Sequence, residues 1–405
     1  MELELIQKAL QQRNISGWLF CDFHHRDPIA YRILGLPEHG MATRRWYYLA
    51  PAQGQPLKLV HRIESGQLDQ LPGEKKVYAS WQEHQQLLEE MLKPFPTLAM
   101  QYSPRNQIPS ISLVDAGTID LVRSFGRNVV SSADLVQQFE ARWSPAAFES
   151  HLEAGRLIDA IVAETFLEIG RRVDSSGETD EFSIQQFILE QLDENLLVTD
   201  GDRPIVAANR NSGNPHYETN REHSSPIRAG DFVLLDVWAK QDKPGAVYYD
   251  ITWVGFVGDD PPEKIEQVFQ IVKGARDRAI EAVQEAVRAG RPLRGWEIDR
   301  VARNVIIDHG YGGYFPHRTG HSIGEQVHGN GANIDDWETR DTREILPFTA
   351  FSIEPGIYLP EFGVRSEVNV FVEERLARVT GPVQNELVRI PVPSRQLQRE
   401  KWLAH

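Results

Sequence analysis

Cysteine is almost absent from this chain of 405 residues, in which Cys21 stands alone. A single cysteine excludes an internal disulfide and a thiolate zinc cluster, so a bound metal would need nitrogen and oxygen ligands. The chain also lacks an apolar run close to the ~20 residues that cross a bilayer. Its first residues, "MELELIQKAL", lack the basic flank and apolar stretch of a signal peptide. We therefore expect a cytoplasmic protein that makes no membrane contact.

An excess of basic residues is missing as well. The chain has 43 lysines and arginines against 58 acidic residues, a formal net charge of -15. Nucleic-acid binding depends on clustered positive charge, so this balance argues against such a partner and favours small substrates. We find no internal repeat. At this length, with 41% hydrophobic residues, two hydrophobic cores are expected, because single cores stop growing at roughly 250 to 300 residues.

The pattern of elements changes near residue 144. Residues 1–140 alternate between a helix near Leu3–Gln12 and apolar strands such as "GWLFCDF", "RRWYYLA" and "LKLVHRI", which predicts a smaller α/β domain. Ser144 can cap a long helix whose first position suits Pro145. Residues 144–405 then combine helices, two of them from Pro261 and from about Trp296, with short strands. They predict an α+β domain in which helices cover one face of a mainly antiparallel sheet.

Four acidic residues interrupt segments that otherwise read as apolar strands: Asp236 in "FVLLDVWA", Asp250 in "VYYDITWV", Glu354 in "FSIEPGIY" and Glu367 in "VRSEVNVFV". A buried carboxylate without a partner costs more than a marginally stable fold can spare. Any one of the four could lie at a strand end in water or pair with Arg365. One arginine cannot neutralise all four, whereas a pair of divalent cations could.

Three histidines stand close together among glycines in "HRTGHSIGEQVHG", residues 317 to 329. A lone histidine is usually a core or surface residue without a role. Beside the acidic set, His321 becomes the candidate for a single nitrogen ligand, with His317 and His328 lining the approach. His216, in "NPHYETN" before the Asp236 strand, is a weaker candidate on spacing alone.

A ligand set of oxygens with one imidazole suits manganese, cobalt, iron or zinc better than a soft metal. Two-metal sites hold their ions roughly 3.5 to 4 Å apart, activate water and polarise a carbonyl group. These are the requirements of amide hydrolysis, so the acids and the histidine predict a hydrolase.

Taken in order, these residues resemble the pita-bread metallopeptidases, which include methionine aminopeptidase, aminopeptidase P and Xaa-Pro dipeptidase. The resemblance spans about residues 144–388. It implies that Asp236 in "LLDVW", Asp250 in "YYDIT", His321 in "TGHSIG", Glu354 in "IEPG" and Glu367 in "RSEVNV" are the five metal ligands. It also implies that Glu354 is the proton shuttle for a hydroxide that bridges two metals, of which manganese is the first choice and cobalt, zinc and iron are alternatives.

Further matches point to the proline-specific branch of this family. The resemblance makes His328 the residue that steadies the tetrahedral intermediate. It also makes His216, His317 and Arg365 candidates for positioning a proline ring and a carboxylate, although Arg365 could instead brace Asp250 or a metal ligand. One departure is the spacing of the two aspartates, 250 − 236 = 14 residues where about eleven are usual, which predicts a longer hairpin turn.

The resemblance therefore implies a pita-bread catalytic domain over 144–405, preceded by a creatinase- or prolidase-like α/β domain over 1–140. The expected activity is hydrolysis of Xaa-Pro dipeptides by a homodimer. Alternatives within the fold are an aminopeptidase P that cuts longer peptides with proline in the second position, and a metal-dependent hydrolase or lyase of small amides such as ectoine. A binding module without catalysis is the last alternative.

Overall fold

The computed structural model describes residues 2–37 and 39–392, and two compact units divide the chain, Met1–Glu140 and Ala141–His405. The part of the predicted second domain beyond residue 392 lies outside the described residues. None of the helices in the described ranges combines the length and apolar character that crossing a bilayer demands.

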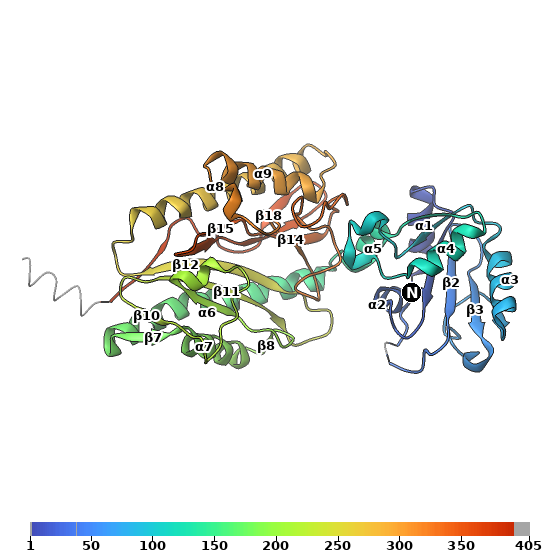
Figure 1. Cartoon of the computed structure of the whole chain (residues 1–405), viewed down its shortest axis with the longest axis horizontal. Helices are drawn as coiled ribbons and strands as arrows, with labels where there is room; N and C mark the ends of the chain where they lie inside the picture. The colour runs from blue at the N-terminus through green and yellow to red at the C-terminus, as the bar shows by residue number, and fades with distance from the viewer. Residues whose placement is uncertain (1, 38, 393–405) are drawn as a thin grey trace, which may run out of the picture. The chain divides into compact units, whose positions relative to one another are not determined.

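The first unit is built on a six-stranded sheet of order β4-β3-β2-β1-β5-β6, in which β2 alone runs against its neighbours (Figure 1). Its strands are β1 (Gly17–Asp22), β2 (Trp46–Pro51), β3 (Leu57–His61), β4 (Glu74–Tyr78), β5 (Thr97–Met100) and β6 (Asn128–Ser131). Its helices are α1 (Leu3–Gln12), α2 (Pro28–Leu34), α3 (Trp81–Leu92), α4 (Ala116–Ser124) and α5 (Ala133–Glu140). The predicted first helix and the first three predicted strands are confirmed.

Alternate residues of β1 enter two different cores of this unit. Trp18 and Phe20 pack with α1, α2 and α5, whereas Leu19 and Cys21 pack with α3 and α4. Successive side chains of a strand point to opposite faces, so both faces of the sheet are covered by helices. The α/β character expected for residues 1–140 follows from this packing.

The described part of the second unit holds four long helices, two larger sheets and two two-stranded sheets, β7–β10 and β15–β16. The helices are α6 (Pro145–Ser176), α7 (Glu181–Glu194), α8 (Glu263–Arg288) and α9 (Gly295–Asp308). One larger sheet has the order β19-β12-β11-β8, with β9 also paired to β11, and the other has the order β13-β14-β17-β18. The strands are β7 (Glu178–Asp180), β8 (Leu197–Val198), β9 (Ile205–Ala208), β10 (Pro226–Arg228), β11 (Phe232–Gln241), β12 (Tyr249–Val257), β13 (Ser322–Ile323), β14 (Thr349–Ile353), β15 (Gly356–Tyr358), β16 (Gly363–Arg365), β17 (Val368–Val372), β18 (Ala377–Val379) and β19 (Val388–Ile390).

Local capping explains where the longest helix begins. The Ser144 hydroxyl accepts a hydrogen bond of 3.1 Å from the Ala147 backbone N–H, and Pro145 occupies the first helical position, as expected. The helix predicted from Pro261 begins two residues later, at Glu263, and the one predicted from about Trp296 begins at Gly295. Differences of this size are usual at helix ends.

Helices cover the sheets of this unit, as expected. Val233 and Leu235 of β11 pack in a core with α6 and α7, whereas Phe232 and Leu234 pack in a second core that includes β14, β17, α8 and α9. Figure 1 shows the strands between these two helix pairs. Both faces of β11 are therefore buried, which fits its apolar run "FVLLDVWA".

Candidate metal centre

The register of two paired strands brings the two aspartates together. In the antiparallel β11–β12 pair, Asp236 lies opposite Thr252 and Asp250 lies opposite Trp238. These four residues are two positions apart on their strands, so their side chains share one face of the hairpin. The predicted longer turn is confirmed, because residues 242–248 connect the strands.

The two glutamates reach the same place from the other sheet. Glu354 follows the last residue of β14 and Glu367 precedes the first residue of β17, and these strands pair antiparallel with Ile353 opposite Val368. The backbone N–H of Glu367 donates to the Thr252 carbonyl at 3.2 Å, which joins the second sheet to β12. Four acids from four strands therefore converge, as predicted.

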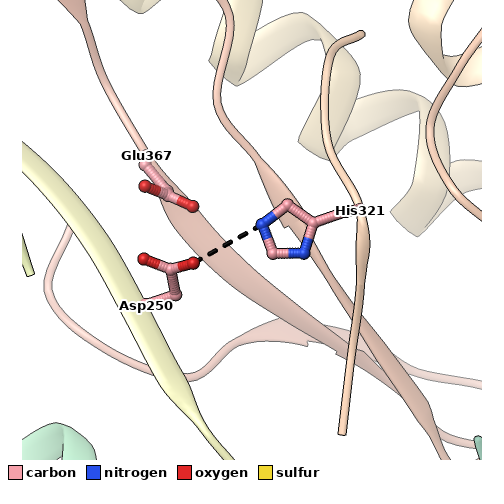
Figure 2. A group of neighbouring side chains, drawn as sticks. All are labelled: Asp250, His321 and Glu367. Atoms are coloured by element: carbon pink, nitrogen blue, oxygen red, sulfur yellow. Dashed lines mark ion pairs between the residues drawn. The ribbon is translucent and has the colours of Figure 1, made fainter. Parts of the chain in front are cut away.

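His321 lies immediately before β13 and faces this acidic group. Its Nε2 is 3.4 Å from an oxygen of Asp250 and 3.4 Å from one of Glu354. Its Nδ1 lies 3.2 Å from the Ser322 carbonyl, a contact that requires Nδ1 to be the protonated nitrogen and leaves the Nε2 lone pair facing the carboxylates. Ligand atoms of Asp250, His321 and Glu367 all lie within 4.8 Å of one another (Figure 2).

Gly320, the residue before His321, is required for close packing of the backbone. A Cβ on Gly320 would lie 1.9 Å from the Ser352 carbonyl oxygen, so a side chain here would push β14 away. The nearest atom to a Cβ on Gly324 is 4.0 Å away, so the surrounding protein atoms do not require glycine at that position.

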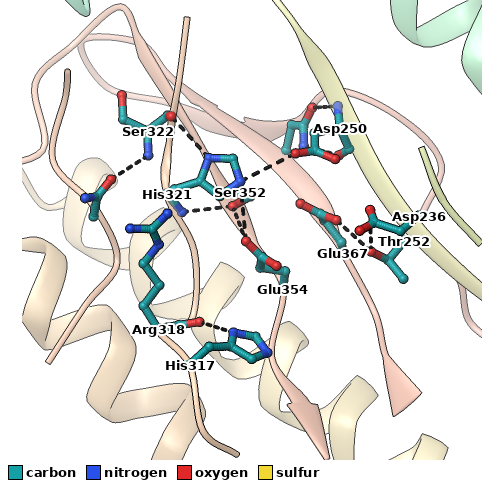
Figure 3. A network of polar contacts seen from close by, with 12 residues as sticks. Asp236, Asp250, Thr252, His317, Arg318, His321, Ser322, Ser352, Glu354 and Glu367 are labelled. Atoms are coloured by element: carbon teal, nitrogen blue, oxygen red, sulfur yellow. Dashed lines mark hydrogen bonds and ion pairs between the residues drawn. The ribbon is translucent and has the colours of Figure 1, made fainter. Parts of the chain in front are cut away.

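Thr252 links the acids to one another in a way that the sequence interpretation missed (Figure 3). Its hydroxyl lies 3.0 Å from Asp236 Oδ1 and 2.8 Å from Glu367 Oε2, and it accepts from Arg365 Nε at 2.9 Å. A hydroxyl has one proton, so it donates to one of these carboxylates at a time. Arg365 also forms an ion pair with Asp236, the only arginine-to-carboxylate contact within 3.5 Å in this acidic group among the described residues.

Burial raises the pKa values of the acids. The pKa of Asp250 rises to about 7, and that of Asp236 to about 6 in spite of Arg365. The pKa values of Glu354 and Glu367 are raised for the same reason, and the charge of Asp250 adds to the effect at Glu367. Oε1 of Glu367 is buried without a hydrogen-bond partner.

These features fit divalent cations. The buried group has four carboxylates, one nearby guanidinium and one neutral imidazole nitrogen, and an oxygen-rich set of this kind suits Mn, Co, Zn or Fe. Cations would neutralise the excess negative charge, and one of them would bind the Glu367 oxygen that has no hydrogen-bond partner. The residues therefore fit the metal pair that the sequence predicts.

A cavity of about 220 Å³ opens onto the acids. The predicted residues His216, His317, His328 and Arg365 all line it. The rings of His328 and His321 meet edge to face with centroids 4.4 Å apart. Repulsion between the two rings when both are protonated, together with burial, lowers the pKa of His328 to about 3. His216 is exposed at this cavity.

His317 is held more tightly than the other two histidines of the cavity. Its Nδ1 lies 2.7 Å from the Arg318 carbonyl and its Nε2 lies 2.7 Å from the Tyr358 hydroxyl. The first contact assigns the proton to Nδ1, so Nε2 accepts from Tyr358. Burial and the charge of Arg365 lower the pKa of His317 to about 3, which keeps the ring neutral.

Several polar residues around the centre escaped the sequence interpretation. The Ser352 hydroxyl donates to Glu354 at 3.1 Å, and the Asn369 side chain binds the backbone N–H and carbonyl of Asp250. A signal was present: Thr252, Ser352 and Asn369 each stand two positions from a predicted acid, on the same strand face. The residues lining the cavity also include Trp238, Arg318 and Glu338.

Comparison with known proteins places this arrangement among peptidases. The profile of metallopeptidase family M24 matches residues 149–374. The Xaa-Pro dipeptidase of Pyrococcus horikoshii is 32% identical over 189 residues, which are 45% of this chain and 48% of that protein. The Xaa-Pro dipeptidase of Pyrococcus furiosus is 33% identical over 185 residues, with the same shares. The chain thus spans about half the length of these curated relatives.

Solved structures extend the likeness in fold to nearly the whole chain. The dipeptidase PepE of Mycobacterium ulcerans has a TM-score of 0.66 at 24% identity, over 96% of this chain and 97% of that one. The X-prolyl aminopeptidase of Caenorhabditis elegans, described as having a di-nuclear active site, has a TM-score of 0.60 at 16% identity, over 95% and 62%. The predicted pita-bread fold, with an α/β domain before it, is confirmed. The matched profile covers more than half of the chain, which therefore belongs to metallopeptidase family M24, a family of hydrolases.

Proposed function

We propose that this chain hydrolyses Xaa-Pro dipeptides with a pair of divalent metal ions. The observation that carries the proposal is the convergence of Asp250, His321 and Glu367 within 4.8 Å, at a cavity that Asp236 and Glu354 also line. The named activity of the Pyrococcus relatives supports the substrate. We assign catalysis to residues 144–405 and a separate α/β domain to residues 1–140.

Each residue of the cavity has a proposed task. Asp236, Asp250, His321, Glu354 and Glu367 would hold the cations, with manganese as the first choice. The cations would supply Lewis acidity for polarising a carbonyl group and for making water more acidic. Glu354 accepts a proton from the attacking water and returns it to the leaving nitrogen of proline. His328, a neutral ring at the cavity, donates a hydrogen bond to the oxygen that becomes negative. His216 and His317 form the walls against which the proline ring lies.

The size of the cavity favours a dipeptide over longer peptides. Its volume of about 220 Å³ is below the ~300 to 1,000 Å³ of pockets that hold drug-sized ligands. A panel of Ala-Pro, Ala-Pro-Ala and ectoine tests this choice. We expect Ala-Pro to have the highest kcat/KM, and faster cleavage of the tripeptide or of ectoine would assign one of the alternative activities.

Glu354→Gln tests the proposed reaction. In protein reconstituted with Mn²⁺, we expect this variant to lower kcat for Ala-Pro by about 10² to 10⁴-fold, because the amide cannot accept the proton. Glu325→Gln makes the same change at an exposed residue of the nearby loop and should leave kcat unchanged. Equal activity of Glu354→Gln and the unaltered protein would remove the assigned role.

A further inference from the structure

The first unit contains a cavity of its own, larger than the one at the metal centre. Its volume is about 1010 Å³, and every residue that lines it belongs to Met1–Glu140. Lining residues come from the ends of β1, β3 and β4 and from the segment that follows β5, so the cavity lies at the carboxyl edge of the parallel strands. The chain leaves β1 for β2 on one side and returns through β5 on the other. Ligands of open α/β sheets bind at this kind of switch point.

A buried carboxylate that lines the cavity lacks a partner. Asp27 is 2% exposed, and its Oδ1 accepts from the Ala30 backbone N–H at 3.0 Å, which caps α2. Its Oδ2 is buried and has no hydrogen-bond partner. Buried polar atoms in native proteins are almost always satisfied, so Oδ2 is suited to a donor that comes from a ligand. Burial, reinforced by the charges of Asp22 and Glu140 and opposed by that of Arg32, raises the pKa of Asp27 to about 7. A cationic group of a ligand at Oδ2 would reverse this rise.

A positive charge lines the same cavity. Cys21 of β1 and Tyr47 of β2 are directly paired and both line the cavity. Burial raises the pKa of the Cys21 thiol, and the charge of Asp27 raises it further. Burial also raises the pKa of Tyr47, and the charge of Arg45 opposes that rise. Arg45 is exposed and lines the cavity, and no carboxylate of the described residues forms an ion pair with it.

We propose that this cavity binds a zwitterionic small molecule, of the class of free amino acids and short peptides, with its ammonium group on Asp27 and its carboxylate on Arg45. An organic amine fits better than a metal ion. Among the described residues, three acidic, histidine or cysteine ligand atoms within 4.8 Å of one another occur at the metal centre of the second unit and not here. The cavity is a second binding site, separate from the site of the proposed hydrolysis.

Calorimetric titration of the full chain with Gly-Gly-Gly tests the proposal. The protein is kept in EDTA so that hydrolysis does not contribute heat. We expect saturable binding, at least tenfold weaker for the N-acetylated peptide, which lacks the ammonium group, and for the peptide amide, which lacks the carboxylate. Absence of binding, or equal binding of all three peptides, would overturn the proposal.

Two variants assign the ends of the ligand to their residues. Asp27→Asn removes the charge but keeps Oδ1 to cap α2, so the fold should persist, which a melting curve checks. We expect it to weaken Gly-Gly-Gly at least tenfold and to leave the acetylated peptide unaffected, whereas Arg45→Gln should weaken Gly-Gly-Gly and spare the amide. Asp69→Asn makes the same charge change at an exposed residue outside the cavity and should bind normally. Unchanged binding by Asp27→Asn, with kcat/KM for Ala-Pro intact, would place the peptide elsewhere and contradict the inference.

Discussion

At the scale of single residues, one hydroxyl connects two of the proposed metal ligands. Thr252 contacts Asp236, Glu367 and Arg365, and it is fully buried. Groups that orient metal ligands typically contribute 10- to 100-fold to metal affinity. We therefore expect Thr252→Val to weaken Mn²⁺ binding by about that factor.

The control for this variant keeps the hydroxyl and changes little else. Thr252→Ser should bind Mn²⁺ almost as well as the unaltered protein when both are followed by calorimetry. If the valine variant binds as tightly as the serine variant, the hydroxyl does not orient the ligands and the description of Thr252 is wrong.

Two arginines, Arg318 and Arg365, line the cavity at the candidate metal centre, and their surroundings differ. Arg365 is engaged with Asp236 and Thr252, so we interpret it as a brace for a metal ligand. No carboxylate of the described residues forms an ion pair with the side chain of Arg318, which leaves its guanidinium available for the carboxylate of a dipeptide. We expect Arg318→Gln to raise KM for Ala-Pro about tenfold with little change in kcat.

A substrate without its carboxylate separates these two roles. Hydrolysis of alanyl-prolinamide should be the same in Arg318→Gln and the unaltered protein, whereas Arg365→Gln should lower kcat for both substrates. If Arg365→Gln instead raises KM for Ala-Pro alone, Arg365 is the carboxylate ligand and the assignments are exchanged.

The acids of the metal centre could be predicted because each is conspicuous in its segment. A carboxylate such as Asp236 among valines and leucines has no explanation without a partner. Thr252 and Asn369 do not differ from their neighbours in this way. Threonine is common in strands, and one polar residue in a strand is unremarkable. The sequence suggested that Arg365 could pair with one of the acids, but not that the partner is Asp236, since that choice depends on how separate sheets pack.

At the scale of elements, helix α6 packs against β12, the strand that carries Asp250 of the candidate metal centre. A Cβ on Gly155 of α6 would lie 2.7 Å from the ring of Tyr249, the residue before Asp250. We expect Gly155→Ala to lower the free energy of unfolding by about 1 to 3 kcal/mol, because the ring cannot move away without displacing β12.

A second helical glycine is the matched control. The nearest atom to a Cβ on Gly274 of α8 is 4.0 Å away, so Gly274→Ala should raise the free energy of unfolding by roughly 0.4 to 1 kcal/mol. Urea unfolding of the two variants measures both values. If both variants change the free energy of unfolding with the same sign, the contact between α6 and β12 is not tight.

Elements with strong local signals were predictable, and their packing was not. The Ser144–Pro145 start of α6 is encoded by neighbouring residues, so it could be read directly. The two cores on either side of β11 combine segments that are distant in the sequence. The apolar run of β11 is the local signal that both of its faces are buried.

At the scale of the whole molecule, buried neutral histidines couple stability to pH. In the second unit, His151 is fully buried between the Tyr248 carbonyl and the Thr380 hydroxyl, and burial lowers its pKa to about 4. In the first unit, burial lowers the pKa of His84 to about 4 as well. Between pH 6.5 and 4 the unfolded chain binds more protons at these residues than the folded chain, so stability falls as the pH falls through this window.

The histidine of the second unit gives the sharper test. The lowered pKa of His151 corresponds to a loss of roughly 3 kcal/mol in the free energy of unfolding between pH 7 and pH 4. We expect His151→Gln to be less stable at pH 7 but to show a shallower fall of unfolding free energy, measured with urea at intervals of half a pH unit. An identical slope in the two proteins would mean that His151 does not titrate as described.

The cavity of the first unit could not be predicted from the sequence. Its lining comes from segments that are up to 103 residues apart, from Cys21 to Ser124, and none of them carries a motif. Neither the unpartnered oxygen of Asp27 nor the presence of Arg45 in the same cavity is visible without the sheet order. The five proposed metal ligands could be named over a longer span because each stands in a distinctive context.

The central claim is that five residues scattered from 236 to 367 form one site for a pair of cations. Calorimetric titration of EDTA-treated protein with Mn²⁺ tests it most directly, with Asp250→Asn measured beside it. We expect two equivalents of Mn²⁺ for the unaltered chain and at most one for the variant. Absence of stoichiometric binding, or two equivalents in both proteins, would contradict the account.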